Sequence, residues 1–477
     1  MSKRLLRHKI FRVRNIFSLL VGIVTIIFIC SLFVLNVLPV KYNIILSIIM
    51  IIIDIVGIIF INVHKKVPLK ILGWIILIIS LGISSIGAYY VSETNSFFDK
   101  SFNKTLDVTS TTYYVVSLKS NGFNKSNIKG DISVYNNTYN INRAFDRLHE
   151  DFNVKRNNYD DLGLMFSDLV SNNTKLLLIE ASSYEIVFSI DNDLKKEDFD
   201  IIYEFVLTTK NKKKASNNVD KFNIFIGGKD FAGLMDFNAV ASVNTSKHTV
   251  ILTSIPRDYY LNIPGSETKD KLSFMSAYGV DTNKKAVENL LGINIDYSVY
   301  INTNSLVDIV DYVGGIEYCS NEAFTTTHAL VLNTYNDYGK KLYVKEGCQT
   351  VNGIEALTIA RERVNIHGGD SQRQKNCQKI MLAIFNKIIT PKTALHYTET
   401  LNELSNIYET DINREVFSNL SKDIINNGKD KWNIITQSVD GLDGKDRVHS
   451  SNMIDWVTYP DQVTIDNCKN QINELFK

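Results

Sequence analysis

The fold of the outer part of this chain is decided by the stretch from Phe222 to Asp230, which reads FNIFIGGKD. Its four apolar residues predict a buried strand, and the Gly-Gly pair places the carboxylate of Asp230 at the end of that strand. Further strands are predicted from Thr249 to Ile255 and from Val299 to Ile301. Helices are predicted over 286–291 and 306–313, each followed by glycine. This alternation predicts a layered α/β/α domain.

A second stretch, from Thr358 to Gln378, contains Arg361 and Arg363. The part around these two arginines is predicted as a strand, in which both side chains point to one face. Two guanidinium groups on one face suit a doubly charged phosphate. Asp370 and Arg373, one helical turn apart behind a Gly-Gly pair, add another charge pair. A solvated salt-bridge surface is the alternative interpretation of such a charge pattern.

Arg257 is predicted at the carboxyl end of the strand 249–255, because Pro256 stops that strand. Ligands of open α/β sheets bind at such strand ends. Asp236 follows Asp230 by six residues. Two carboxylates near phosphate-binding arginines can hold Mg²⁺, with water and phosphate completing its shell. Turn formation is the alternative role for two aspartates in a glycine-containing loop.

The amino-terminal part predicts a membrane anchor. Residues 1–15 form a basic tail, and residues 16–92 contain three apolar runs, at about 16–38, 44–63 and 69–91. Each is close to the roughly 20 residues that cross a bilayer as a helix. Basic residues in the tail and in the 64–70 loop place both inside the cell and everything after Ser92 outside. Asp54, in the second run, is either functional or a helix-paired acid.

Residues 94–214 predict a small α/β accessory domain between the anchor and the second outer domain, 218–477. Strands are expected at 113–118, 175–179 and 201–207, and helices at 141–152 and 162–169. We interpret Glu180, Glu185 and Asp191 as turn and surface acids. The tail after Pro391, with helices near 398–407 and 463–476 and a strand near 432–438, is expected to complete the second domain.

The core of that domain, residues 222–389, resembles the catalytic domain of the LytR-CpsA-Psr family. The motifs that carry the resemblance are GKD at 228–230, SIPRD at 254–258, DKL at 270–272, AVENLLGINIDY at 286–297, VDYVGGI at 310–316, VNGIEAL at 351–357, ARER at 360–363, and Gly369-Asp370 with Arg373. Residues 94–214, behind three predicted spans, are similar to the accessory domain of capsule-type members.

The resemblance implies a membrane-anchored extracellular phosphotransferase of a Gram-positive type bacterium. Such enzymes bind a polyprenyl-pyrophosphate-linked glycan and move the glycan phosphate to peptidoglycan during wall teichoic acid or capsule assembly; no nucleic acid partner is expected. The matching positions are Arg257, Arg361, Arg363 and Arg373 for the pyrophosphate, Lys271 for a further phosphate contact, and Asp230 and Asp236 for Mg²⁺ or Mn²⁺. Asp370 orients Arg373 or acts as a base toward the acceptor, and the resemblance leaves both roles open.

Three departures from the family pattern leave two alternative functions open. Leu234 and Met235 stand where an Arg-Ser pair usually precedes the aspartate, Ser371 stands where capsule-type members often carry arginine, and Cys377 stands where they carry glutamine. A weakened member that binds lipid-linked glycan as a scaffold is one alternative. A regulator of capsule expression is the other, although the short cytoplasmic tail offers no helix-turn-helix for DNA.

Four cysteines lie in the predicted outer part, where disulfides persist. The preferred pairing joins Cys319 to Cys348 and Cys377 to Cys468, although four cysteines permit three pairings. Cys30 lies in the first predicted span.

Overall fold

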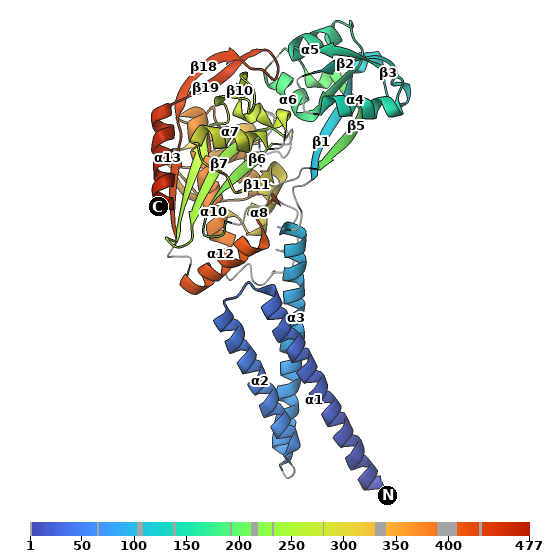
Figure 1. The fold of residues 1–477 in the computed structure, drawn as a ribbon, viewed down its shortest axis with the longest axis vertical. Coiled ribbons are helices and arrows are strands. Elements are labelled where there is room, and N and C mark those ends of the chain that lie inside the picture. The colour runs from blue at the N-terminus through green and yellow to red at the C-terminus, as the bar shows by residue number, and fades with distance from the viewer. Residues whose placement is uncertain are drawn as a thin grey trace. The chain divides into compact units, whose positions relative to one another are not determined.

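The computed structural model describes residues 2–63, 66–102, 108–136, 140–190, 193–210, 218–230, 233–279, 281–329, 340–388, 408–428 and 432–477 (Figure 1). The chain divides into two compact units. In the described part, an anchor unit comprises Met1–Asn103 and Asn413–Trp432. An outer unit comprises Lys104–Leu395, Asn406–Ile412 and Asn433–Lys477. The predicted helix near 398–407 lies outside the described residues.

The anchor unit is built on α1 (Ser2–Leu35), α2 (Val40–Asn62) and α3 (Val67–Phe102). Each contains a stretch long and apolar enough to cross a membrane, with mean hydropathy between 2.2 and 3.2. The prediction of three spanning helices is therefore confirmed. Asp54 of α2 is buried and accepts a hydrogen bond from the Ser80 hydroxyl of α3, so it is a helix-paired acid.

Helix α12 (Arg414–Asn427) belongs to the anchor unit, although the sequence assigns it to the catalytic domain. Its Arg414 guanidinium donates to the Leu35 carbonyl oxygen at 3.1 Å and to Asn95 Oδ1 at 2.7 Å. The Phe417 ring meets Phe98 edge-on, with 5.3 Å between ring centroids. The apolar face of α12 packs against α3. The spacing of apolar residues shows that a helix has such a face but not which element covers it.

The accessory domain is a five-stranded mixed sheet in the order β3-β2-β4-β1-β5. Its strands are β1 (Val108–Leu118), β2 (Gly130–Tyr135), β3 (Val154–Tyr159), β4 (Leu177–Glu180) and β5 (Phe199–Lys210). The helices are α4 (Ile141–Asp151), α5 (Leu162–Val170) and α6 (Ala181–Ile190). The small α/β module predicted from the sequence is confirmed.

The catalytic domain is built on a six-stranded sheet in the order β16-β11-β6-β7-β8-β17. Its strands are β6 (Lys221–Lys229), β7 (Met235–Asn244), β8 (Thr249–Ile255), β11 (Tyr297–Asn302), β16 (Tyr408–Thr410) and β17 (Asn433–Ser438). One face packs Phe225 and Val240 against α7 (Thr282–Leu291) and α13 (Gln462–Phe476). The other packs Leu252 against Met381 of α10 (Gly369–Ile388). The layered α/β/α fold is confirmed.

The accessory and catalytic domains share one hydrophobic core. Buried residues of the accessory helices, such as Leu162 and Tyr184, belong to the same cluster as Leu234, Phe274 and Val448 of the catalytic domain. The accessory domain is therefore packed against its neighbour through apolar surface rather than joined to it by a linker alone.

The predicted disulfide between Cys319 and Cys348 is present, and it joins directly opposed residues of β12 (Ile316–Ser320) and β15 (Gly347–Val351). The predicted pairing of Cys377 with Cys468 is wrong, because both are free. Cys377 lies on α10, whereas Cys468 of α13 packs with Phe225 and Val240 on the opposite face of the sheet. The sheet separates the two sulfurs.

The expectation that Glu180 is a turn or surface acid is wrong, because this residue is only 7% exposed at the end of β4. Burial raises the pKa of its carboxyl to about 8. Glu185 is half-buried and ion-paired with Lys196. Asp191 lies outside the described residues. The continuous apolar run that ends at Ile179 does not distinguish a buried acid from a turn residue at position 180.

Replacing Glu180 with glutamine should stabilise the protein at pH 8. The carboxyl ionises near its ordinary value of 4.5 in the unfolded chain and near 8 in the folded one. Its contribution to stability is therefore complete below 4.5 and is lost as the pH rises toward 8. The variant should gain about 4 kcal/mol at pH 8 relative to pH 4. Denaturant unfolding at both pH values measures this, with the exposed Glu197→Gln as control; identical pH profiles for the two variants would refute it.

Candidate active site

A cavity of about 160 Å³ lies between the catalytic sheet and three helices, α8 (Thr303–Tyr312), α9 (Gly353–Arg361) and α10. Its walls are mainly apolar, and they include Ile226, Phe237, Leu306, Leu357, Ile380 and Ile384. Four charged side chains also line it, namely Lys229, Asp236, Arg361 and Arg373. The cavity thus combines a hydrocarbon-compatible wall with cationic groups.

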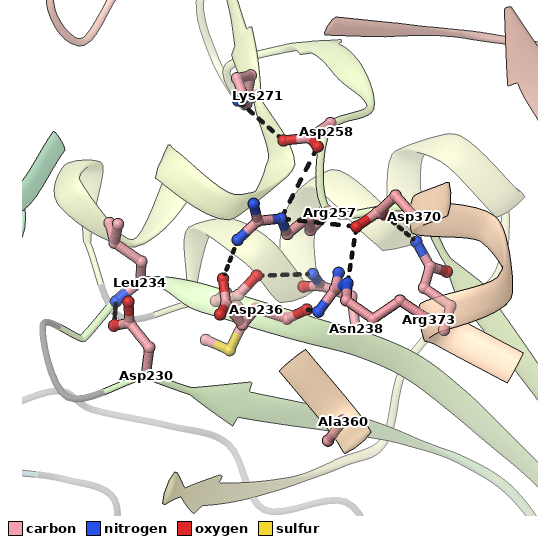
Figure 2. A network of polar contacts seen from close by, with 12 residues as sticks. Asp230, Leu234, Asp236, Asn238, Arg257, Asp258, Lys271, Ala360, Asp370 and Arg373 are labelled. Atoms are coloured by element: carbon pink, nitrogen blue, oxygen red, sulfur yellow. Dashed lines mark hydrogen bonds and ion pairs between the residues drawn. The ribbon is translucent and has the colours of Figure 1, made fainter. Parts of the chain in front are cut away.

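Arg257 follows Pro256 at the end of β8, as predicted, and aspartates surround it (Figure 2). Its Nη1 is ion-paired with Asp236 Oδ1. Its Nε lies 3.8 Å from Asp258 Oδ2 and 3.9 Å from Asp370 Oδ1. The guanidinium plane is fixed by carboxylates from three segments, which is the preorganisation expected of an anion-binding arginine.

Asp370 orients Arg373 at the start of α10. Gly368 and Gly369 both have positive φ, 93° and 54°, which allows the chain to enter the helix sharply. Asp370 Oδ1 accepts from Arg373 Nε at 2.7 Å, and its Oδ2 accepts from the Gln374 amide at 3.1 Å. Burial opposes ionisation of Asp370, but Arg373 and Arg257 hold its pKa well below the usual range. Both oxygens are engaged, which favours the orienting role over the base.

Arg373 itself is only 4% exposed in its side chain and lines the cavity. Its Nη1 donates to the Asp236 carbonyl oxygen at 3.1 Å. The remaining nitrogen, Nη2, is buried without a hydrogen-bond acceptor among the described residues. A buried guanidinium N–H without an acceptor is costly, so this position suits an anionic oxygen of a ligand.

Arg361 and Arg363 do not share a face, because the predicted strand is the helix α9. A capping box between Asn352 and Glu355 starts this helix, and Arg361 is its last residue. Arg361 lines the cavity, whereas Arg363 is exposed and is not among the lining residues. Buried Glu362 accepts from the backbone N–H groups of the following turn. The sequence Asn-Gly-Ile-Glu at 352–355 carried the capping signal that contradicts a strand.

Lys271, at the end of β10 (Lys269–Lys271), lies between two carboxylates rather than on the cavity wall. Its Nζ is 2.8 Å from Asp258 Oδ1 and 2.9 Å from Asp455 Oδ2, and its side chain is 8% exposed. Burial opposes ionisation of Asp258, but Lys271 and Arg257 lower its pKa. Asp455 was missed because it comes from a strand far along the chain with no motif around it.

Asp230 directly follows β6, and Asp236 is the second residue of β7. Asp230 is buried, and its Oδ1 accepts from the Leu234 N–H at 2.8 Å. Leu234 in turn belongs to the core shared with the accessory domain. The two aspartates keep the strand-end placement expected of them, and their carboxylate oxygens are hard ligands of the kind that Mg²⁺ takes.

Cys377 also lines the cavity, and burial raises the pKa of its thiol to about 11. At pH 8 a thiol with this pKa is about 0.1% thiolate, against roughly a quarter for an ordinary cysteine. Iodoacetamide should therefore modify Cys377 roughly two orders of magnitude more slowly than the cysteine of a Val364→Cys variant, an exposed position. Peptide mass spectrometry measures both rates; equal rates would show that the thiol is accessible and ionised.

An apolar cavity that carries arginines oriented by aspartates is chemically suited to an amphipathic anion. This chain belongs to the LytR_cpsA_psr family, whose profile matches residues 184–474, more than half of its length. The prediction of the family is therefore confirmed.

Named relatives are polyisoprenyl-teichoic acid–peptidoglycan teichoic acid transferases. TagU of Enterococcus faecalis is 29% identical over 232 residues, which cover 47% of this chain and 72% of that protein. TagU of Bacillus subtilis is 34% identical over 187 residues, covering 37% of this chain and 56% of that protein. The crystal structure of TagV from Bacillus subtilis superposes with a TM-score of 0.44 at 23% identity, covering 54% of this chain and 98% of that one.

Proposed function

We propose that this protein is a membrane-anchored, extracellular phosphotransferase that moves a glycan phosphate from a polyprenyl pyrophosphate carrier to peptidoglycan. Family membership and the activity named for its relatives support the reaction class. The observation that carries the proposal is the mainly apolar cavity lined by Arg361 and Arg373. The basic residues of the tail and of the 64–70 loop favour an orientation with the outer unit outside the cell.

The donor has an apolar lipid part and an anionic pyrophosphate part, and the cavity offers a matching surface to each. The apolar wall accepts the part of the lipid next to the phosphate, and Arg373 Nη2 offers a buried donor to a pyrophosphate oxygen.

The charge balance of the site supports a divalent cation. Five side chains of the site are basic and five are acidic. The basic ones are Lys229, Arg257, Lys271, Arg361 and Arg373, and the acidic ones are Asp230, Asp236, Asp258, Asp370 and Asp455. A pyrophosphate therefore adds negative charge to a site that is already balanced. Asp230 and Asp236 would hold Mg²⁺ or Mn²⁺, which when bound neutralises pyrophosphate charge.

The chain's own residues act on transfer mainly by positioning and charge neutralisation. A sugar hydroxyl of the acceptor forms the new bond to the phosphorus of the glycan phosphate. The bond from that phosphorus to the bridging oxygen breaks, and polyprenyl phosphate leaves. Arg257 and Arg373, already oriented by aspartates, stabilise the charge that develops on the phosphoryl oxygens. The hydroxyl proton is lost to solvent or to a carboxylate.

The scaffold alternative is less well supported. Asp236 still lies beside Arg257 and on the cavity wall despite the altered residues before it. The two functions are separated by incubating the full-length protein and lipid-linked donor with and without a peptidoglycan oligosaccharide. A transferase releases polyprenyl phosphate only when the acceptor is present, whereas a scaffold binds the donor and releases none in either case.

A further inference from the structure

A β-hairpin near the carboxyl terminus contacts the accessory domain at its tip. The hairpin consists of β18 (Gly441–Arg447) and β19 (Ile454–Pro460), and its tip is residues 448–453 (Figure 1). Tyr135 Oη, at the end of β2, donates to the His449 carbonyl oxygen at 3.2 Å. Asn452 Nδ2 donates to Asp161 Oδ2 at 2.7 Å, and Val448 is fully buried in the shared core. The tip is thus held by the accessory domain.

The same hairpin holds the segment that carries Arg257. The Thr458 N–H of β19 donates to the Asp258 carbonyl oxygen at 2.7 Å, which fixes the backbone next to Arg257. At the tip, the Ser450 N–H donates to Asp270 Oδ2 at 2.6 Å, and the Lys271 N–H donates to Asp270 Oδ1 at 2.7 Å. Backbone contacts from one hairpin therefore reach both segments that flank the site.

A side-chain relay completes the connection. Asp455 of β19 is ion-paired with Lys271, and Lys271 is ion-paired with Asp258. Asp258 in turn lies beside Arg257 Nε (Figure 2). Lys271 and Asp258 are both largely buried, so their partners are not exchanged easily for water. Without the Asp455 carboxylate, Asp258 is the one remaining ion-pair partner of Lys271 among the described residues. The stronger pairing of Lys271 with Asp258 then weakens the electrostatic contact between Asp258 and Arg257.

We infer that the β18–β19 hairpin is the positioning element through which the accessory domain sets the orientation of Arg257, with Asp455 as its positioning residue. The identity of the donor rests on the proposed function; the coupling between the hairpin and Arg257 does not. The accessory domain thereby acts on the donor site although none of its described residues lines the cavity.

The test compares two changes at opposite ends of the hairpin in the full-length protein in nanodiscs. Asp455→Asn removes the carboxylate charge that is ion-paired with Lys271. The double variant Tyr135→Phe/Asp161→Ser removes the contacts at the tip, and serine keeps the cap that Asp161 gives to the Leu164 N–H of α5. The matched control is Asp446→Asn, directly opposite Asp455 in the hairpin, whose carboxylate contacts Tyr459 of the same hairpin.

Two readouts are needed, one of them independent of any ligand. Hydrogen–deuterium exchange over residues 255–275 should become faster in Asp455→Asn and in the tip variant, and stay unchanged in the control. Affinity for farnesyl pyrophosphate with Mg²⁺ should fall roughly tenfold in Asp455→Asn and roughly threefold in the tip variant. Asp455→Glu should recover most of the affinity. In an Arg257→Ala background, Asp455→Asn should cause no further loss.

The inference is overturned if Asp455→Asn and the tip variant behave like the control in exchange and in affinity. It is also overturned if the loss persists in the Arg257→Ala background, because the effect then bypasses Arg257. If the unaltered protein does not bind farnesyl pyrophosphate but exchange over 255–275 responds as expected, the coupling holds and the donor assignment in the proposed function fails.

Discussion

Replacing Arg373 with alanine should lower kcat/KM for glycan transfer roughly 10²- to 10³-fold, the loss that follows removal of one preorganised donor to a developing anion. Arg373 lines the cavity, and its Nη2 has no acceptor among the described residues until a ligand supplies one. The change also leaves Asp370 with the Gln374 amide and the more distant Arg257 as its partners. Arg373→Lys keeps the positive charge but loses the planar guanidinium with its several fixed donors, so an intermediate loss of kcat/KM is expected. Steady-state kinetics on the full-length protein measures both variants.

Arg363→Ala is the matched control for this prediction. The family resemblance predicted Arg363 as one of the pyrophosphate-binding arginines, whereas in the structure it is exposed and is not among the residues that line the cavity. Its loss should therefore change kcat/KM by roughly twofold or less, as for a surface charge. Equal losses in Arg363→Ala and Arg373→Ala would contradict the site as described, because the cavity geometry would then not decide which arginines act.

Replacing Asp236 with asparagine should have the second large effect. The change removes one of two carboxylates that would hold the metal and the main ion-pair partner of Arg257 Nη1. Activity should fall roughly 10²-fold or more, and the Mg²⁺ concentration for half-maximal rate should rise at least roughly tenfold. Calorimetric titration with Mn²⁺ provides a second readout.

The control for this second variant is Asp443→Asn, an exposed aspartate of β18. It should leave both the rate and the metal titration unchanged. If Asp236→Asn keeps the Mg²⁺ dependence of the unaltered protein, Asp236 is not a metal ligand. Its role would then be restricted to orienting Arg257.

Local pattern was sufficient for much of the fold. Apolar runs identified the three membrane helices, and the run ending in Gly227-Gly228 identified the central strand with Asp230 at its end. Pro256 identified where Arg257 leaves β8. These features depend on neighbouring residues, so they are legible in sequence order.

Features that depend on distant parts of the chain were missed. Asp455 meets Lys271 across 184 residues, and the position of Cys468 on the opposite face of the sheet from Cys377 is a property of the fold. Glu180 is buried by packing that its neighbours do not reveal. The error at Arg361 is different in kind, because the capping box at Asn352 and Glu355 can be read from the sequence and is stronger evidence for a helix than the Arg-x-Arg spacing is for a strand.

The central claim is tested most directly by the mass of the acceptor. The full-length protein in nanodiscs is incubated with a polyprenyl-pyrophosphate-linked glycan, an unlabelled peptidoglycan oligosaccharide and Mg²⁺, and the oligosaccharide is weighed by mass spectrometry. We expect a gain equal to the glycan plus one phosphate, lost on addition of EDTA and in Arg373→Ala. A protein that binds the donor while the acceptor gains no mass under any metal or donor would contradict the transferase and establish the scaffold instead.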